Sequence, residues 1–357
     1  MLTSRKTSPP IDDLAVARVV ADVDGLALTS GAGGVSVTRV EVDHGLGRPA
    51  SFLVEATDLT SDEIDWTDGS ELQEGAPVKI SMGWTPAGEP VFAGEVLGIE
   101  LELSSSAGPR VTLRGHDRLH RLARARKTRA FVQKRDSEIA EDLAREHDMR
   151  PAGPQTDIVH PYVMQADQTD LAFLRARARQ LGFIIRVDDK ELVFAPRHLD
   201  EEPLLTATLG DNLLEFFGRT SVLGLSGGAE ARGWDPATQK PLVASTTRVA
   251  AKMAGRVLGV AIADANFGPQ VTSVQGARIL VADEATAAAA AELEAMAIDH
   301  VTCEGKMIGA AVLRPGNVLA IAGVGQRFSG NYWLTRVIHR YGRGGFTTSF
   351  EGRRTAT

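Results

Sequence analysis

The sequence predicts a mainly β protein with α/β insertions. Val78 to Trp84 and Leu97 to Leu103 alternate apolar and polar residues, which is the period-2 pattern of a half-buried strand. The 36 glycines among 357 residues fit many tight turns between short strands. A degenerate repeat between the first and last β regions is the third observation. Together these features favour barrels or sandwiches over a βαβ fold.

Residues 35–115 form the first predicted β region. Val35 and Val37 have odd numbers whereas Val40 and Val42 have even ones, so the alternation changes phase between them. One extra residue reverses the faces of a strand, and the sequence therefore predicts a β-bulge near Thr38–Arg39.

A compact α/β module is predicted for residues 116–204. Asp136 or Ser137 can cap a first helix, and Thr169 can cap a second one that ends at Gly182. Residues 183–194 then form a hairpin that turns at Asp188–Lys190.

The rest of the chain returns to short strands, with a helix predicted over residues 283–301 and capped by Asp283. This gives an N-terminal extension, a first β-barrel domain, the α/β module, a second β-barrel domain in two pieces, and a helix-containing insert. Their predicted bounds are 1–18, 19–115, 116–204, 205–250 with 305–357, and 251–304.

The internal repeat aligns four pieces in order. Gly75, VKISMG, FAGEVLGI and VTLRG match Gly316, VLAIAG, FSGNYWLTRV and FTTSFEG. We expect Phe92 and Phe328 to pack into equivalent barrels, and Gly94 and Gly330 to allow close approach of the backbone.

Composition excludes several classes of protein. The formal charge of −7 argues against a dedicated nucleic-acid binder. The N-terminus lacks the apolar stretch of a signal peptide, and no segment is long and apolar enough to span a membrane. The one cysteine, Cys303, excludes an intrachain disulfide and a zinc site built from cysteines.

Two motifs are candidates for catalysis. Gly224–Gly228 matches the G-x-S-x-G nucleophile elbow around Ser226, but the glycine and proline that follow would break the helix that this elbow requires. His116 and His120 resemble a zincin motif with an aspartate in place of its glutamate and with no clear third ligand. A cell-wall hydrolase built on either motif is the alternative function.

Three further features are weaker. The basic run that begins at Arg114 would suit phosphate contacts of a DNA-binding regulator, yet Phe131 is its one stacking candidate. The acidic residues between Asp62 and Glu74 lack calcium-loop spacing. Cys303 beside His300 has the look of a weak dyad. We therefore expect no catalytic residue, no cofactor and no bound metal.

The run QADQTDLAFLRARARQLGFIIRVDDKELVFAP, Gln165 to Pro196, resembles a segment of tail-hub proteins of contractile injection machines, which include the phage late control protein D family and the N-terminal half of type VI spike proteins (VgrG). Further matching pieces are FAGEVLGI with GHDRLHRL, SEIAEDLA, GDNLLEF with RGWDP, and the run from LRPGNV to RYG. The residues that carry the resemblance, and hence the structural or interface candidates, are Phe92, Gly94, Thr169, Asp170, Phe173, Gly182, Phe328 and Gly330.

The resemblance implies a structural baseplate hub with two tube-like β-barrels per chain. Such hubs are homotrimers that form a pseudo-sixfold ring and adapt a hexameric tail tube to a trimeric spike. The implied partners are the tube protein above, baseplate wedge proteins outside, and a spike that we expect to be a separate protein because this chain stops at Thr357. The implied location is the bacterial cytoplasm during assembly and then the phage or phage-tail-like particle, with no membrane contact at rest and no specific nucleic acid.

Overall fold

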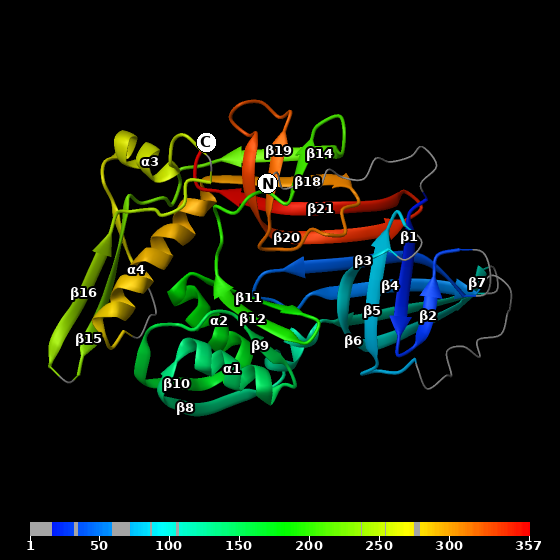
Figure 1. The fold of residues 1–357 in the computed structure, drawn as a ribbon, viewed down its shortest axis with the longest axis horizontal. Coiled ribbons are helices and arrows are strands. Elements are labelled where there is room, and N and C mark those ends of the chain that lie inside the picture. The colour runs from blue at the N-terminus through cyan, green and yellow to red at the C-terminus, as the bar shows by residue number, and fades with distance from the viewer. Residues whose placement is uncertain are drawn as a thin grey trace, which may run out of the picture.

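The chain folds into two strand-rich bodies, an α/β module and a helix-backed hairpin (Figure 1). This computed structural model describes residues 16–31, 35–58, 72–85, 88–104, 107–236, 238–253, 255–274 and 279–357. Strands dominate and helices are few, so the prediction of a mainly β protein is confirmed.

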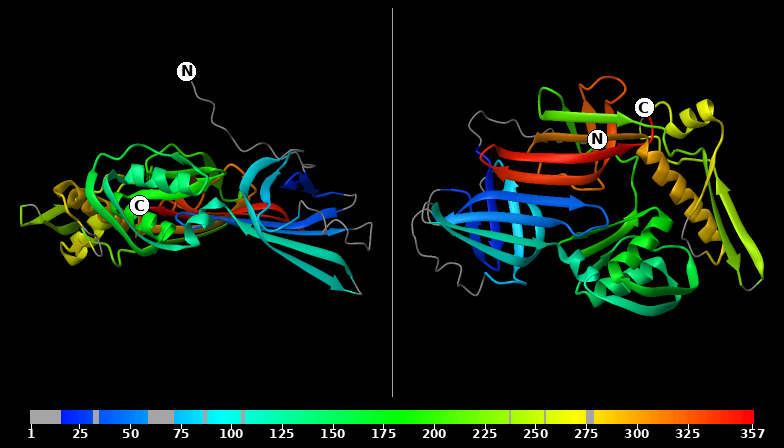
Figure 2. Two further views of the ribbon diagram at one scale, coloured as in Figure 1. Left: turned by 90° about the horizontal axis from the view of Figure 1, so that it is seen from below. Right: turned by 180° about the vertical axis from the view of Figure 1, so that it is seen from behind.

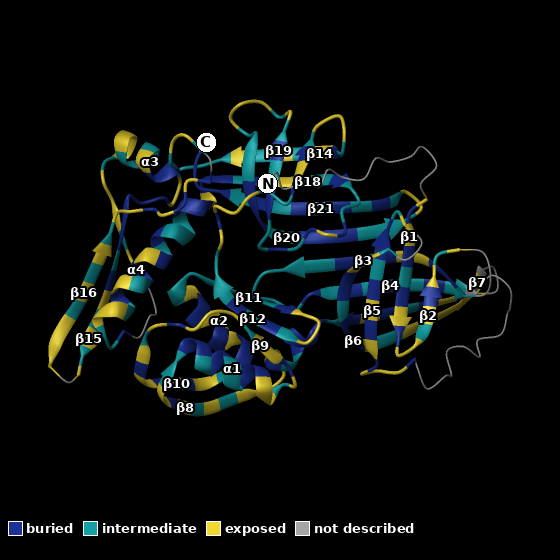
Figure 3. Ribbon diagram, in the orientation of Figure 1, coloured by how far each residue is buried: buried dark blue, intermediate teal, exposed yellow. Residues whose placement is uncertain are grey.

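The first body is a closed barrel of seven strands in the order β3-β2-β1-β5-β6-β7-β4, which β3 and β4 close by pairing with each other. Buried and less buried residues alternate along these strands (Figure 3), because successive side chains point to opposite faces. The predicted bulge lies in β3, where the register against β4 shifts between Val37 and Arg39. The bounds are β1 Arg18–Val23, β2 Leu26–Thr29, β3 Val35–Gly45, β4 Ser51–Asp58, β5 Pro77–Gly83, β6 Glu89–Ser104 and β7 Ala107–His116.

The α/β module follows the first barrel. Its elements are η2 Arg118–Ala123, β8 Arg126–Arg135, α1 Asp136–Glu146, β9 Arg150–Ala152, β10 Val159–Thr169, α2 Asp170–Leu181, β11 Phe183–Asp188 and β12 Glu191–Pro196. Thr169 caps α2 as predicted, since its hydroxyl accepts from the Ala172 amide at 3.1 Å, and Gly182 ends the helix at a φ of +69°. The prediction that Asp136 or Ser137 caps α1 is wrong, because Arg135 takes the cap position and Asp136 is turned into a buried ion pair.

The second body is a six-stranded sheet in the order β14-β18-β21-β20-β19-β13. Strands β13 and β14 are the two outermost strands of this sheet. An isolated β-bridge between Leu209, which follows β13, and Leu213 of β14 brings them together. The bounds are β13 Leu205–Thr208, β14 Leu213–Thr220, β18 Val301–Ile308, β19 Val318–Ala322, β20 Gly330–Gly342 and β21 Gly345–Arg354.

The predicted second barrel included residues 205–250, and this prediction is wrong for residues 228–246. They form β15 Gly228–Asp235 and β16 Lys240–Thr246, which pair with β17 Val271–Ser273 in a separate sheet. This hairpin projects beside α4 (Figure 1), and it buries one face against the alanines of that helix. The remaining elements are α3 Gly259–Phe267, α4 Ala282–Ala297 and η3 Ile298–His300. Asp283 is not the cap of α4; the Glu284 carboxylate instead accepts from the Leu280 and Val281 amides.

Candidate assembly surface

A single antiparallel layer of eight strands runs through both bodies. Strand β20 of the second body pairs with β3 of the first, from Arg336 opposite Gly45 to Tyr341 opposite Val40. The layer therefore runs β14-β18-β21-β20-β3-β4-β7-β6, and every neighbouring pair in it is antiparallel. Figure 2 shows β20 and β21 lying alongside β3 and β4 in the view from behind.

The two halves of this layer carry register shifts at matching places. The pair β3–β4 shifts between Val37 and Arg39, and the pair β14–β18 shifts between Leu213 and Glu215. The register of hairpin β6–β7 shifts between Val96 and Gly98. The register of hairpin β20–β21 shifts at the matching place, between Leu334 and Arg336.

Matching glycines precede β5 and β19. Gly75 has a φ of +92° and Gly316 a φ of +95°, a conformation that favours glycine. The Gly75 amide donates to the Val96 carbonyl at 2.7 Å, and the Gly316 amide donates to the Leu334 carbonyl at 2.8 Å. The two glycines therefore fix the entry of two equivalent hairpins.

Phenylalanine rings cover glycines on the neighbouring strand in both halves. Phe52 lies opposite Gly115, and Phe350 lies opposite Gly305. A Cβ atom on Gly115 would lie 2.6 Å from the Phe52 ring, which is closer than side chains tolerate. Glycine is required at these positions so that the buried ring can pack over the backbone.

The F-x-G pieces of the repeat do not occupy equivalent strand positions. Phe92 is buried within β6 and pairs with Ile80, whereas Phe328 is half-buried in the turn before β20. The place that corresponds to Phe92, opposite Ile321 of β19, is taken by Gly330 and not by Phe328. The alignment of the two motifs is therefore wrong by two residues. Both rings still pack against the core of their own body.

Ion pairs cover the polar face of the layer, and two of them connect the two bodies across the β3–β20 junction. Arg336 contacts Asp43 at 2.8 Å, and Arg340 contacts Glu41 at 3.2 Å. Burial acts to raise the pKa of Asp43, but hydrogen bonds from Arg336 and Arg48 outweigh it and hold that pKa below its usual value. Sequence reasoning missed this junction, although charges alternate along both strands. Further pairs on this face are Arg39–Glu55, Arg114–Glu100, Arg110–Glu102, Arg336–Glu351 and Lys306–Glu215.

The layer ends in two strand edges. Among the described residues, the half of β6 from Gly98 onward pairs only with β7, and β14 pairs only with β18 apart from the bridge at Leu213. Leu101 is 47% exposed, Leu103 59% and Phe217 65%. Exposed apolar residues beside unpaired backbone groups mark both edges as places where another strand can add.

The other predicted interface residues hold the α/β module together. Phe173 of α2 stacks on Phe131 with ring centroids 5.5 Å apart. Asp170 is almost fully buried and contacts Lys127 and Arg129 of β8 and His147, which directly follows α1. Burial acts to raise the pKa of Asp170, but hydrogen bonds from His147, Lys127 and Gln165 hold it well below the usual value. Whether Thr169, Asp170, Phe173 or Gly182 also touches a partner stays a prediction.

The surroundings of Ser226 differ from those of a nucleophile elbow. Its hydroxyl hydrogen-bonds the Thr272 hydroxyl at 2.8 Å, and strand β15 follows where the elbow needs a helix.

His116 and His120 have partners that leave little for a metal. His116 Nδ1 donates to the Ala50 carbonyl at 3.2 Å, and His120 Nε2 lies 2.8 Å from the Glu95 carboxylate. Arg118 and Arg121 share that carboxylate. In the described parts of the chain no group of three or more His, Cys, Asp or Glu side chains could hold a metal ion.

The basic run is paired within the chain. Apart from Arg124, its members contact carboxylates of the same chain, which leaves little free charge for phosphates. The pairs are Arg118–Asp189, Arg121–Asp148, Arg126–Asp167, Lys127–Glu146, Arg129–Asp170, Lys134–Asp142 and Arg135–Glu138.

The remaining sequence candidates carry no site. Burial raises the pKa of the Cys303 thiol to about 12, and His300 Nδ1 donates to the Ser221 carbonyl. Of the acidic stretch from Asp62 to Glu74, all but Glu74 lies outside the described residues. None of the helices that the structure describes combines the length and apolar character needed to cross a bilayer.

Several solved structures share this fold. The chain is similar to the 43 kDa tail protein of prophage MuSo2 from Shewanella oneidensis, with a TM-score of 0.68 and 14% identity over 95% of this chain and 98% of that one. A tail protein from Neisseria meningitidis MC58 gives 0.68 and 12% over 95% and 96%. The third is an E. coli component of the type VI secretion system, described as similar to tail proteins gp27 and gp5 of bacteriophage T4; it gives 0.59 and 16% over 91% and 75%.

The resemblance of the sequence to tail hubs is therefore confirmed at the level of the fold. No curated protein matches the sequence. The family model described as the Alg8 N-terminal domain matches residues 16–342, almost the whole chain, and the chain belongs to this family.

Proposed function

We propose that this chain is a structural hub subunit in the baseplate of a contractile injection machine, and that three copies close a ring between a tail tube and a spike. The observation that carries the proposal is the β3–β20 junction, which joins the two bodies through a continuous layer. The tail proteins that share the fold support the same role. The role is architectural and needs no catalytic residue.

In this role the two bodies are duplicated barrels. The shared register shifts and the matched glycines support an equivalence of β3, β4, β5, β6 and β7 with β14, β18, β19, β20 and β21. In this scheme β20 corresponds to β6, and β3 corresponds to β14. The junction inside one chain is then a template for the contact between chains.

The template fixes a register for the contact between subunits. Within the chain, Ile338 of β20 lies opposite Asp43 of β3. The equivalent residues are Glu100 of β6 and Arg219 of β14, so Glu100 of one subunit should lie opposite Arg219 of the next. Both side chains are exposed and of opposite charge, which favours this contact.

The same contact covers Leu103, the more exposed of the two leucines at the β6 edge. In the transferred register Leu103 faces Phe216, and the unpaired backbone groups of β6 and β14 satisfy each other. Three copies of an eight-stranded layer give a closed ring of 24 strands, with true threefold and approximate sixfold symmetry. Closure removes both exposed edges, which would otherwise invite aggregation.

A cysteine pair tests the register. Glu100→Cys with Arg219→Cys should form a disulfide between subunits under mild oxidation, because opposed residues of antiparallel strands lie within disulfide reach. We expect a covalent trimer of the 38.1 kDa chain on a non-reducing gel.

The matched control is Leu101→Cys with Arg219→Cys, which places the two thiols on opposite faces of the layer. Equal cross-linking of both pairs, or no cross-linking of the first pair in assembled particles, would contradict the proposed ring.

A further inference from the structure

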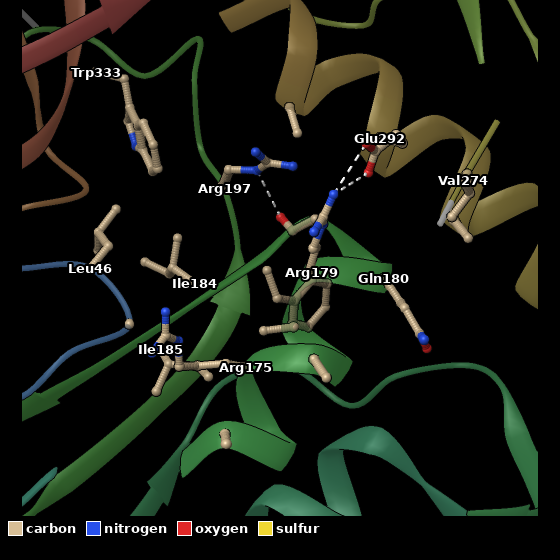
Figure 4. Close-up of a pocket in the computed structure, with 18 residues that line it drawn as sticks. Leu46, Arg175, Arg179, Gln180, Ile184, Ile185, Arg197, Val274, Glu292 and Trp333 are labelled. Atoms are coloured by element: carbon tan, nitrogen blue, oxygen red, sulfur yellow. Dashed lines mark hydrogen bonds and ion pairs between the residues drawn. The ribbon is translucent and has the colours of Figure 1, made fainter. Parts of the chain in front are cut away.

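A cleft of about 680 Å³ lies where the α/β module meets α4 and the junction of the two bodies (Figure 4). Its floor is apolar and contains Leu46, Ile184 and Trp333. Trp333 is 5% exposed, so the floor is a fixed part of the core. The volume is within the range of about 300–1,000 Å³ that is typical of binding sites.

Two helices form the walls of the cleft. Helix α2 lines it with Ala172, Arg175, Ala176 and Arg179, which share one exposed face because they are spaced by three and four residues. Helix α4 lines the other side through residues that include Ala288, Glu292 and Ala295. Because the wall residues of α2 are exposed, the cleft opens to solvent along that helix.

The charge of the cleft is mainly positive. Arg179 contacts both oxygens of Glu292 at 3.2 Å, which neutralises one arginine. Arg197 donates to the carbonyls of Gly182 and Ala291, and its Nε also lies 3.9 Å from the Glu294 carboxylate. Arg175 forms no ion pair with any described residue. Arg175 is therefore the arginine of the cleft that is left to meet an anionic partner.

We infer that this cleft binds an acidic amphipathic segment of another protein of the particle. Apolar side chains of the segment would cover the floor at Ile184 and Trp333, and a carboxylate of the segment would meet Arg175. The open wall along α2 favours a segment of a larger protein, because a small ligand is usually more enclosed. The inference rests on the proposed role as a hub, since it places the partner in the same particle.

The test uses short overlapping peptides that cover the other structural proteins of the particle and this chain itself, immobilised and probed with the purified full-length chain. We expect the peptides that bind to be acidic and to contain apolar residues. Arg175→Glu should weaken their binding roughly tenfold, since it replaces an attraction by a repulsion. Ala176→Trp should weaken it as well by filling the cleft from an exposed position.

Arg124→Glu is the matched control, because Arg124 is an exposed arginine of the same module that does not line the cleft. It should leave binding unchanged. The inference is overturned if the bound peptides are neutral or basic, if they come only from this chain, if both cleft variants bind like the control, or if no peptide binds.

The disulfide between positions 100 and 219 keeps the two proposals apart. Arg175 and Ala176 belong to the α/β module and are far in the sequence from the edge strands β6 and β14. The covalent trimer should therefore still form in the variants Arg175→Glu and Ala176→Trp. A variant that loses peptide binding but still forms the trimer is altered in the cleft alone. A failure to form the trimer instead contradicts the proposed hub.

Discussion

His160 joins four elements of the fold and makes one interaction that should depend strongly on pH. It lies on β10 with 1% of its side chain exposed, and its Nε2 is 2.7 Å from the Asp136 carboxylate at the start of α1. Its Nδ1 contacts Glu284 of α4, and Arg177 of α2 approaches Nε2 at 3.0 Å. A protonated His160 therefore bridges two carboxylates and holds α4 against the module.

The magnitude follows from the pKa. Burial acts to lower the pKa of His160, but hydrogen bonds to Asp136 and Glu284 raise it from 6.5 to about 8. A difference of about 1.5 pH units corresponds to roughly 2 kcal/mol of stability. Because the pKa is higher in the folded state, this stabilisation is complete below about pH 6.5 and is lost as the pH rises through 8.

Urea denaturation of the wild type and of His160→Gln measures the effect. The gap in free energy of unfolding between them should shrink by roughly 2 kcal/mol from pH 6 to pH 9. His44 is a control of opposite sign, since burial lowers its pKa to about 3. The gap for His44→Gln should not shrink as the pH rises. An equal gap for His160→Gln at both pH values would refute the reasoning.

Two further predictions concern the cores. Phe52→Ala and Phe350→Ala each remove a ring that is at most 3% exposed, so each should lower the free energy of unfolding by about 3–5 kcal/mol in urea denaturation; a loss below about 1 kcal/mol in either would contradict the equivalent roles of the two rings. Cys303 is 2% exposed and its pKa is raised to about 12. It should therefore resist maleimide at pH 8 in the native protein and react in urea, and rapid native labelling would show that β18 opens.

Local signals predicted the elements that depend on local chemistry. Thr169 and Gly182 bound α2 because a hydroxyl cap and a left-handed glycine act within a few residues. The bulge in β3 was visible because an added residue changes the phase of the apolar pattern. The hairpin of β11 and β12 likewise forms over the predicted residues.

Strand pairing and register depend on distant partners, and there the sequence was less informative. Residues 228–246 alternate as a strand in any sheet would, so their partner strand β17 and the cover from α4 could not be predicted. The F-x-G alignment is wrong by two residues because a shift of two keeps every side chain on the same face. Only the pairing of β3 with β20 reveals Arg336 and Asp43 as partners.

A cryo-electron microscopy map of the assembled particle would show whether three copies of this chain close a ring. We expect a ring of 24 strands made of three copies of this chain, with β6 of each subunit paired to β14 of the next and Glu100 opposite Arg219. A map in which β6 and β14 lie unpaired, or in which the number of copies is not three, would contradict it.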